Sequence, residues 1–214
     1  MLSDILRWGV RRSDREGSAH ALAPRDEPVV VSKGLPKFLW ALTQQPSPTL
    51  LDFGPVIGTN VEYFGERLGC KLFIEDLLAD IERHRRAGTL EELPAAFGKR
   101  FRHADGSVNG ILCWDVFDFL DKAAAPALAR QIVRMLKPGG TVMGFFCSVP
   151  AEQASFRKYE IVDDSSLRHR QHSGAGGPRR VLQNRDIIRM FEGLSVSDSF
   201  LLKGSTREMI LRRR

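Results

Sequence analysis

Long apolar runs are missing from this sequence of 214 residues. No stretch approaches the ~20 consecutive apolar residues that a membrane-spanning helix needs, so we expect no membrane segment. The first residues, MLSDILRWGVRR, also lack the apolar core and small-residue cleavage site of a signal peptide. These two absences favour a cytoplasmic protein.

Cysteine is scarce as well. The chain has three cysteines, Cys70, Cys113 and Cys147, which are widely spaced and lie in apolar segments. They form no CxxC pair that would indicate zinc, and we expect them to be reduced core residues. His169 and His172 lie three residues apart but have no evident further ligand. The sequence therefore predicts no metal site.

Positive charge is concentrated in the last third of the chain and is not matched there by negative charge. Residues 151–214 hold 13 Lys and Arg against 8 Asp and Glu, which accounts for most of the net charge of +6. Such an excess can attract an anionic substrate or a nucleic acid. Acidic residues interrupt it, however, and few aromatic residues interleave with it, unlike surfaces that stack single strands. A solvated basic face is the simpler interpretation.

The N-terminal residues 1–32 differ in composition from the rest. Residues 2–10 predict a short amphipathic helix, and residues 11–28, rich in charge, Ser, Gly, Ala and Pro, predict a flexible linker. We expect one domain over residues 33–214. An irregular insertion at residues 150–180 contains Tyr159 and the two histidines, with a possible hairpin that pairs Tyr159–Val162 with Leu167–His172.

The domain alternates predicted strands and helices. The strands are expected at Leu50–Phe53, Lys71–Ile74, Lys99–Asp105, Gly110–Trp114, Thr141–Phe146, Ser197–Leu202 and Glu208–Arg212. The helices are expected at Leu35–Gln45, Val61–Leu68, Leu77–Arg86, Thr89–Phe97 (opened by a Thr89–Glu92 capping box), Ala124–Leu136 and Arg185–Phe191. This order predicts a Rossmann-like, doubly wound α/β fold: a mostly parallel, seven-stranded sheet with helices on both faces. The last two strands, joined by a tight turn, must be antiparallel to each other.

The stretch Thr49–Asn60, TLLDFGPVIGTN, joins a buried strand to a helix through a turn that contains Gly54 and Gly58. In open α/β sheets such a turn lies at the carboxyl end of a strand, where ligands bind. Glycine lets the backbone approach a ligand closely, and the helix start offers free N–H groups. The pattern indicates a site for a nucleotide-like ligand.

Four motifs in order resemble those of class I S-adenosylmethionine-dependent methyltransferases of the type 11-like kind, over about Thr49 to Arg214. LDFG with Gly58 resembles the first motif, and Glu75, 23 residues after Asp52, resembles the acid that ends the second strand. DGSVNGIL at residues 105–112 resembles the approach to the fourth strand. RMLKPGG at residues 134–140 resembles the turn before the fifth.

The resemblance implies S-adenosyl-L-methionine as cofactor and a transferase activity. Glu75 would then hold the ribose, since a carboxylate can accept hydrogen bonds from two hydroxyls. Asp105 is the candidate for the adenine, and Asp115 for the polar group that faces the methyl. Helix capping or turn formation is the alternative role for each acid. The implied cofactor-binding residues are Asp52, Gly54, Pro55, Val56, Gly58, Glu75, Asp76, Asp105, Trp114 and Asp115.

Two residues depart from the family pattern. Val56 stands where the family has glycine, and Asn109 where it often has Asp. A β-branched residue tolerates positive φ poorly, so the loop must follow another path or bind the cofactor less well. Methyl transfer depends mainly on alignment, and no catalytic residue is forced by the sequence. We expect a small-molecule acceptor; an RNA or protein acceptor, or a non-catalytic binding protein, are the alternatives.

Overall fold

The computed structural model describes residues 27–171, 176–202 and 204–214. The predicted helix over residues 2–10, most of the predicted linker and His172 lie outside the described residues. Among the described helices, none is both long and apolar enough to cross a membrane.

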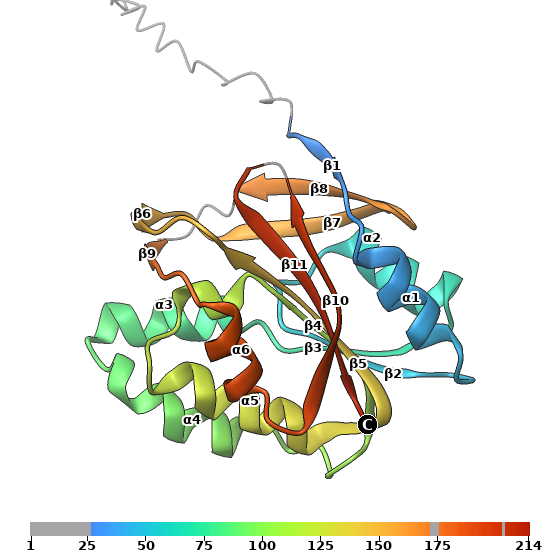
Figure 1. Cartoon of the computed structure of the whole chain (residues 1–214), viewed down its shortest axis with the longest axis horizontal. Helices are drawn as coiled ribbons and strands as arrows, with labels where there is room; N and C mark the ends of the chain where they lie inside the picture. Colours follow the sequence, from blue (N-terminus) through green and yellow to red (C-terminus); the bar gives the residue numbers. More distant parts are fainter. Residues whose placement is uncertain (1–26, 172–175, 203) are drawn as a thin grey trace, which may run out of the picture.

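The domain is built on a six-stranded sheet of order β10-β11-β5-β4-β2-β3 (Figure 1). The strands β2 to β5 run parallel to one another, and β11 is antiparallel to both of its neighbours. This confirms the predicted mostly parallel α/β sheet and its antiparallel closing pair. The strands are β2 (Thr49–Asp52), β3 (Lys71–Ile74), β4 (Val108–Trp114), β5 (Leu136–Cys147), β10 (Leu194–Leu202) and β11 (Thr206–Arg213).

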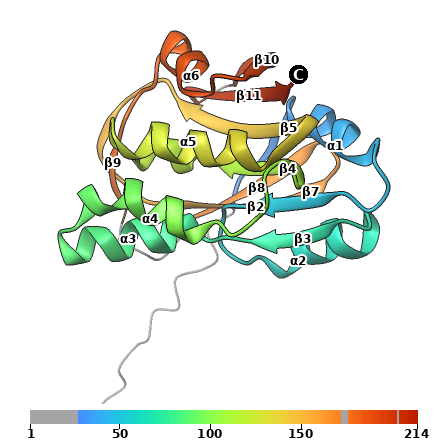
Figure 2. The same ribbon diagram turned by 90° about the horizontal axis from the view of Figure 1, so that it is seen from below.

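Helices cover both faces of the sheet (Figures 1 and 2). Successive strand residues point to opposite faces: Leu51 packs in one core with α3, α4, α5 and α6, while Leu50 packs in the other with α1 and the α2 segment. The helices are α1 (Leu35–Thr43), α2 (Gly58–Glu62, continued by a π-helical turn Tyr63–Arg67), α3 (Leu77–Ala87), α4 (Leu93–Arg100), α5 (Ala124–Met135) and α6 (Asn184–Met190), with 3₁₀ turns at Leu90–Glu92 and Val116–Phe119.

The strand predicted at Lys99–Asp105 is not formed, and the described sheet has six strands instead of seven. Helix α4 continues to Arg100, and the following residues stay irregular up to β4. The Arg134 guanidinium donates hydrogen bonds to the carbonyl oxygens of Phe101 (3.2 Å) and His103 (2.8 Å). A side chain thus satisfies acceptors that a neighbouring strand would otherwise pair with.

Two local predictions were also wrong. The capping box is absent, because the Thr89 hydroxyl lies 2.9 Å from His84 Nδ1 and does not cap the following turn. The predicted closing turn at residues 137–140 is a bulge inside β5: Leu136 pairs with Val108 and Thr141 with Gly110, with four β5 residues between them. Gly139 has a φ of 75° there, a conformation that glycine adopts without strain.

Two smaller sheets come from the insertion and the segment before α1. The predicted hairpin is confirmed as β7 (Arg157–Asp163) with β8 (Ser166–Gln171), and β1 (Val29–Val31) adds to β8. Residues 29–31, which the composition groups with the N-terminal extension, therefore pair with the insertion. The other sheet joins β6 (Ala151–Ala154) to β9 (Gly177–Arg179).

Asn60 ties the hairpin to the first helix after β2. Its buried amide donates to the Tyr159 carbonyl oxygen and accepts from the Ile161 N–H, both at 2.8 Å. Truncation would leave a buried carbonyl and a buried N–H unpaired. We expect Asn60→Ala to lower the free energy of unfolding by about 2 kcal/mol and to speed hydrogen exchange at the Ile161 amide.

The matched control for this prediction is Thr59→Ala. Thr59 is the exposed neighbour of Asn60 and makes one 3.2 Å hydrogen bond to Glu160. We expect its loss to change the unfolding free energy by less than ~0.5 kcal/mol. Equal effects of the two substitutions in urea denaturation would show that Asn60 does not clamp the hairpin.

Candidate active site

The carboxyl ends of β2, β3 and β4 meet at one edge of the sheet. The Glu75 N–H donates to the Asp52 carbonyl oxygen at 2.7 Å, and the indole Nε1 of Trp114 donates to the Asp52 carboxylate at 2.6 Å. Residues that follow three different strands are thereby brought together. This is the place where open α/β sheets bind ligands.

Asp52 organises the turn after β2. Its Oδ1 accepts hydrogen bonds from the Gly54 N–H (2.8 Å) and from the Trp114 indole. Burial raises the pKa of Asp52 to about 6, against the lowering effect of these two hydrogen bonds. Asp52 therefore acts first as a structural acceptor that fixes the loop.

The Trp114 indole lies directly over Gly54. A Cβ added to Gly54 would be 2.8 Å from the indole Cδ1, so the close approach requires glycine. On the other side the indole stacks on the Tyr159 ring, with centroids 5.1 Å apart and planes at 6°. Trp114 itself has a φ of 47°, a strained conformation for an aromatic residue. The indole thus fills the space beside Gly54 that a side chain would take.

The remaining loop residues differ in exposure. Pro55 is buried, whereas the Val56 side chain is 68% exposed and points away from the packed core. Gly58 is the first residue of α2, and a Cβ added there would meet nothing within 4 Å. Of the two motif glycines, only Gly54 is required by packing.

The two acids after β3 have different partners. Asp76 is the N-cap of α3 and accepts from the Ala79 N–H at 3.0 Å, which is the capping role raised as an alternative. Glu75 pairs through Oε2 with Arg100 at 3.1 Å, while its Oε1 is 3.6 Å from His103 Nε2. Because that distance exceeds an ordinary hydrogen bond, Oε1 has capacity to accept from a ligand.

Asp105 lies at the opposite edge of the sheet, before β4 begins. Its side chain is 79% exposed and pairs with Arg134 at 2.7 Å. Since β2, β3 and β4 run parallel, a residue before β4 cannot reach the edge where β2 ends. The structure therefore does not bring Asp105 to the other predicted site residues, and Asn109 near the start of β4 is equally remote.

A buried polar cluster lies beside Trp114. The Asp115 and Tyr159 side chains are 3% and 2% exposed, and neither the Asp115 carboxylate oxygens nor the Tyr159 hydroxyl makes a hydrogen bond of ordinary geometry with the described residues. Desolvation raises the pKa of Asp115, opposed by Tyr159 and by the charges of Arg157 and Arg179. Buried polar groups without partners are rare in proteins and often mark functional sites.

Sequence reasoning missed two members of this cluster, Asp118 and Arg157. Asp118 accepts from the Cys147 N–H at 3.0 Å, and burial raises its pKa to about 7, with the charge of Asp115 adding to the shift. Residues three apart lie on the same side of a 3₁₀ turn, as Asp115 and Asp118 do here. This spacing is visible in the sequence and could have indicated that the two carboxylates lie together. Arg157 offers no comparable signal, because only the hairpin brings it near.

His169 of β8 packs against this cluster. Its ring meets the Tyr159 ring edge-on with centroids 4.9 Å apart. Burial lowers the pKa of His169 to about 4, so it is neutral at physiological pH. It serves as packing for Tyr159.

The groups at this edge fit S-adenosylmethionine in kind. Glu75, which follows β3, has a carboxylate oxygen with capacity to accept a hydrogen bond from a ligand. At Gly54 there is no room for a side chain, and the backbone can be approached closely. The indole of Trp114 covers Gly54 in the present arrangement. The residues therefore fit the cofactor once the indole moves off Gly54.

The sequence model of the family described as methyltransferase domain matches residues 25–193. The chain thus belongs to the methyltransferase-domain family and is a class I S-adenosylmethionine-dependent methyltransferase, which confirms the resemblance drawn from its four motifs. No curated protein matches the sequence significantly.

Several solved structures are similar to this chain at low sequence identity. The glycopeptide N-methyltransferase MtfA complexed with S-adenosylmethionine is 14% identical, with a TM-score of 0.44, over 86% of this chain and 95% of that one. The CcbJ methyltransferase from Streptomyces caelestis is 15% identical (TM-score 0.47, 84% and 94%). The Burkholderia thailandensis 1,6-didemethyltoxoflavin-N1-methyltransferase is 15% identical (TM-score 0.48, 85% and 77%).

Proposed function

We propose that this methyltransferase transfers the methyl group of S-adenosylmethionine to a polar small molecule whose nucleophilic atom is received by Asp115. The observation that carries the proposal is the pair of buried polar side chains, Asp115 and Tyr159, which interact with each other and with Arg157 but make no hydrogen bond of ordinary geometry with the described residues. They lie next to Trp114, which contacts the first-motif loop. A polar acceptor would supply hydrogen bonds of ordinary geometry to this pair.

The enclosure of this pair favours a small acceptor over RNA or protein. The β7–β8 hairpin covers Asp115 with Tyr159 and is held to the α2 segment by Asn60. The C-terminal Arg213 lies elsewhere: it donates to the carbonyl oxygen of Val133 at 2.9 Å, at the opposite edge of the sheet. Arg157 and Arg179 lie near Asp115, so the enclosure of the pair, and not the position of the basic residues, favours the small acceptor.

On the cofactor side, Glu75 would hold the ribose hydroxyls through Oε1, and the loop Gly54–Gly58 would lie against the rest of the molecule. Bound S-adenosylmethionine supplies an electrophilic methyl on a sulfonium. Asp115 would orient the acceptor and take its proton when the nucleophile arrives protonated. A pKa raised by burial brings this carboxylate nearer to the operating pH of a general base.

The test is a calorimetric titration of the full chain with S-adenosylmethionine and S-adenosylhomocysteine. It is followed by a screen of small amines, phenols and carboxylic acids for release of S-adenosylhomocysteine. Binding of the cofactor together with turnover of one acceptor, lost in Asp115→Asn, is the expected result. Turnover of RNA or protein but of no small molecule would overturn the acceptor class.

The indole of Trp114 competes with the cofactor for Gly54. Trp114→Phe keeps an aromatic ring for Tyr159 but removes the 2.6 Å hydrogen bond that holds the indole on Asp52. A charge-assisted hydrogen bond contributes about 1.5 kcal/mol, so we expect S-adenosylhomocysteine to bind up to about tenfold more tightly. Weaker binding by the variant would show that the indole belongs to the bound state.

A second candidate function is favoured by the same indole. If Trp114 never leaves Gly54, the chain is a methyltransferase-fold protein that does not bind the cofactor. That function predicts no binding of either ligand by the native chain at millimolar concentration. Binding gained in Trp114→Phe would show that the indole closes the native loop.

A further inference from the structure

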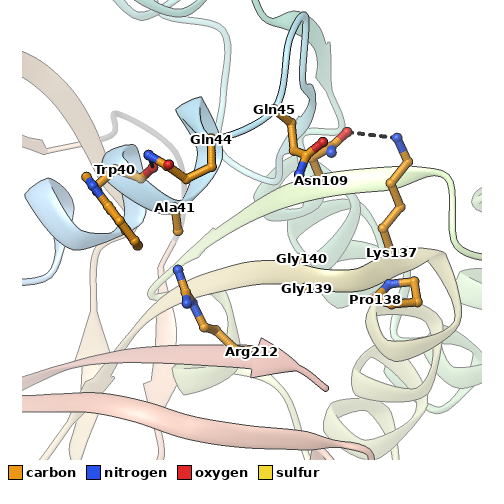
Figure 3. Close-up of a pocket in the computed structure, with 10 residues that line it drawn as sticks. All are labelled: Trp40, Ala41, Gln44, Gln45, Asn109, Lys137, Pro138, Gly139, Gly140 and Arg212. Atoms are coloured by element: carbon orange, nitrogen blue, oxygen red, sulfur yellow. Dashed lines mark hydrogen bonds between the residues drawn. The ribbon is translucent and has the colours of Figure 1, made fainter.

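A cavity of about 260 Å³ lies at the opposite edge of the sheet from the candidate active site (Figure 3). Trp40 and Ala41 of α1 and the residues after that helix form one wall. Asn109 of β4, the β5 bulge and Arg212 of β11 form the others. The bulge is the most recognisable family motif of the sequence, yet it lies away from the edge where methyl transfer is proposed.

The charge of this cavity is of one sign. Its lining contains the cations Lys137 and Arg212, three side-chain amides and no acidic residue. Lys137 Nζ donates to the Asn109 side-chain oxygen at 3.1 Å, which holds the ammonium at the rim (Figure 3). Two cations that line one cavity without an acidic residue are suited to an anionic group such as phosphate.

Trp40 adds an aromatic surface to this cavity. Its side chain is 60% exposed, although the neighbouring α1 residues Phe38 and Leu42 are fully buried. Its one described ring partner is the Arg212 guanidinium, 5.7 Å from the ring centroid. An exposed indole that carries a guanidinium is the arrangement on which nucleic-acid bases stack.

We propose that this cavity binds a nucleotide, with its base on Trp40 and its phosphate between Lys137 and Arg212. The size of the cavity limits the ligand to a single nucleotide unit, either free or at the end of an RNA chain. Asn109 and Trp114 lie near the two ends of strand β4 (Val108–Trp114), so the two sites are separated by roughly 16 Å of strand. The cavity is therefore distinct from the cofactor edge and does not depend on the proposed methyl transfer.

Calorimetric titration of the full chain with uridine 5′-monophosphate tests the proposal, since a pyrimidine nucleotide is a poor mimic of the cofactor's adenosine. The titration is carried out with S-adenosylhomocysteine in excess. We expect saturable binding that weakens about tenfold in Trp40→Leu and about tenfold in Arg212→Gln. Arg185→Gln, which removes the same charge from an 83% exposed side chain on α6, should leave it unchanged.

Further ligands test which part of the nucleotide is bound, and whether the nucleotide is free or belongs to an RNA chain. Inorganic phosphate and uridine should each bind more weakly than the nucleotide. A hexauridylate that binds more tightly than the mononucleotide would identify RNA as the source, and equal or weaker binding would identify a free nucleotide. The proposal is overturned if no nucleotide binds, if phosphate binds as well as the nucleotide, or if Trp40→Leu and Arg212→Gln behave like Arg185→Gln.

Discussion

Replacement of Asp118 by Asn is expected to make the protein more stable at pH 8 while leaving its stability at pH 4 nearly unchanged. In the folded chain, burial raises the pKa of Asp118 from 3.8 to about 7, and the charge of Asp115 adds to this shift. The folded state therefore holds a proton that the unfolded state releases between pH 4 and pH 7. The contribution of protonated Asp118 to the free energy of unfolding is fully present below pH 4. It is lost as the pH rises through 7, the pKa of this group in the folded chain.

The size of the expected stability difference follows from the pH interval between the pKa values of Asp118 in the unfolded and folded chains. Each unit of difference in pKa corresponds to about 1.4 kcal/mol, so the wild-type chain should lose about 3 kcal/mol between pH 5 and pH 8 through this carboxylate alone. Asn keeps an oxygen that can accept from the Cys147 N–H but cannot ionise. The variant should therefore exceed the wild type by about that amount in urea unfolding at pH 8.

Asp105→Asn is the matched control, because this carboxylate is 79% exposed and pairs with Arg134 at the surface. Surface ion pairs contribute about 0–1 kcal/mol, so its stability relative to wild type should change little with pH. A difference between wild type and Asp118→Asn that stays constant from pH 5 to pH 8 would contradict the buried-charge explanation.

Replacement of Glu75 by Ala is expected to weaken the binding of S-adenosylhomocysteine by roughly 1–3 kcal/mol, at least about fivefold in Kd. The prediction depends on the proposed ribose contact through Oε1, the oxygen with no hydrogen bond of ordinary length. Calorimetry on folded protein gives the affinity directly, without a known acceptor.

Two further variants separate ribose binding from a general effect. Glu75→Gln retains an acceptor oxygen and should recover most of the affinity, whereas a purely electrostatic role would make it as weak as Glu75→Ala. Glu91→Ala changes an exposed residue of the 3₁₀ turn Leu90–Glu92 and should bind like the wild type. Unchanged affinity in Glu75→Ala would remove Glu75 from the site.

Much of the fold could be predicted because its signals are local. The alternation of Leu50 and Leu51 between two cores is a period of two residues within one strand. Helix α3 begins at the Asp76 cap and ends at Gly88, which has a φ of 71°, and both boundaries depend on nearby residues. The Lys99–Asp105 prediction failed because Arg134, some thirty residues away, satisfies that segment's carbonyls.

The site was predictable only in part. The first-motif loop and Glu75 follow strands, and the edge they share is given by the parallel order. Their partners come from remote parts of the chain: Trp114 lies 62 residues from Asp52, and Asn60 lies 99 residues from Tyr159. No local pattern encodes such pairs.

The sequence by itself determined the order of strands and helices, the mostly parallel sheet, the family and the edge at which its motifs gather, because each depends on periodicity and spacing along the chain. Only the tertiary structure decided that Asp105 lies at the edge opposite to the other predicted site residues, that the Trp114 indole rests on Gly54, and that Asp115 and Tyr159 are buried together. These are contacts between distant segments. They are set by how side chains fill the space above the sheet, which packing decides and sequence spacing does not.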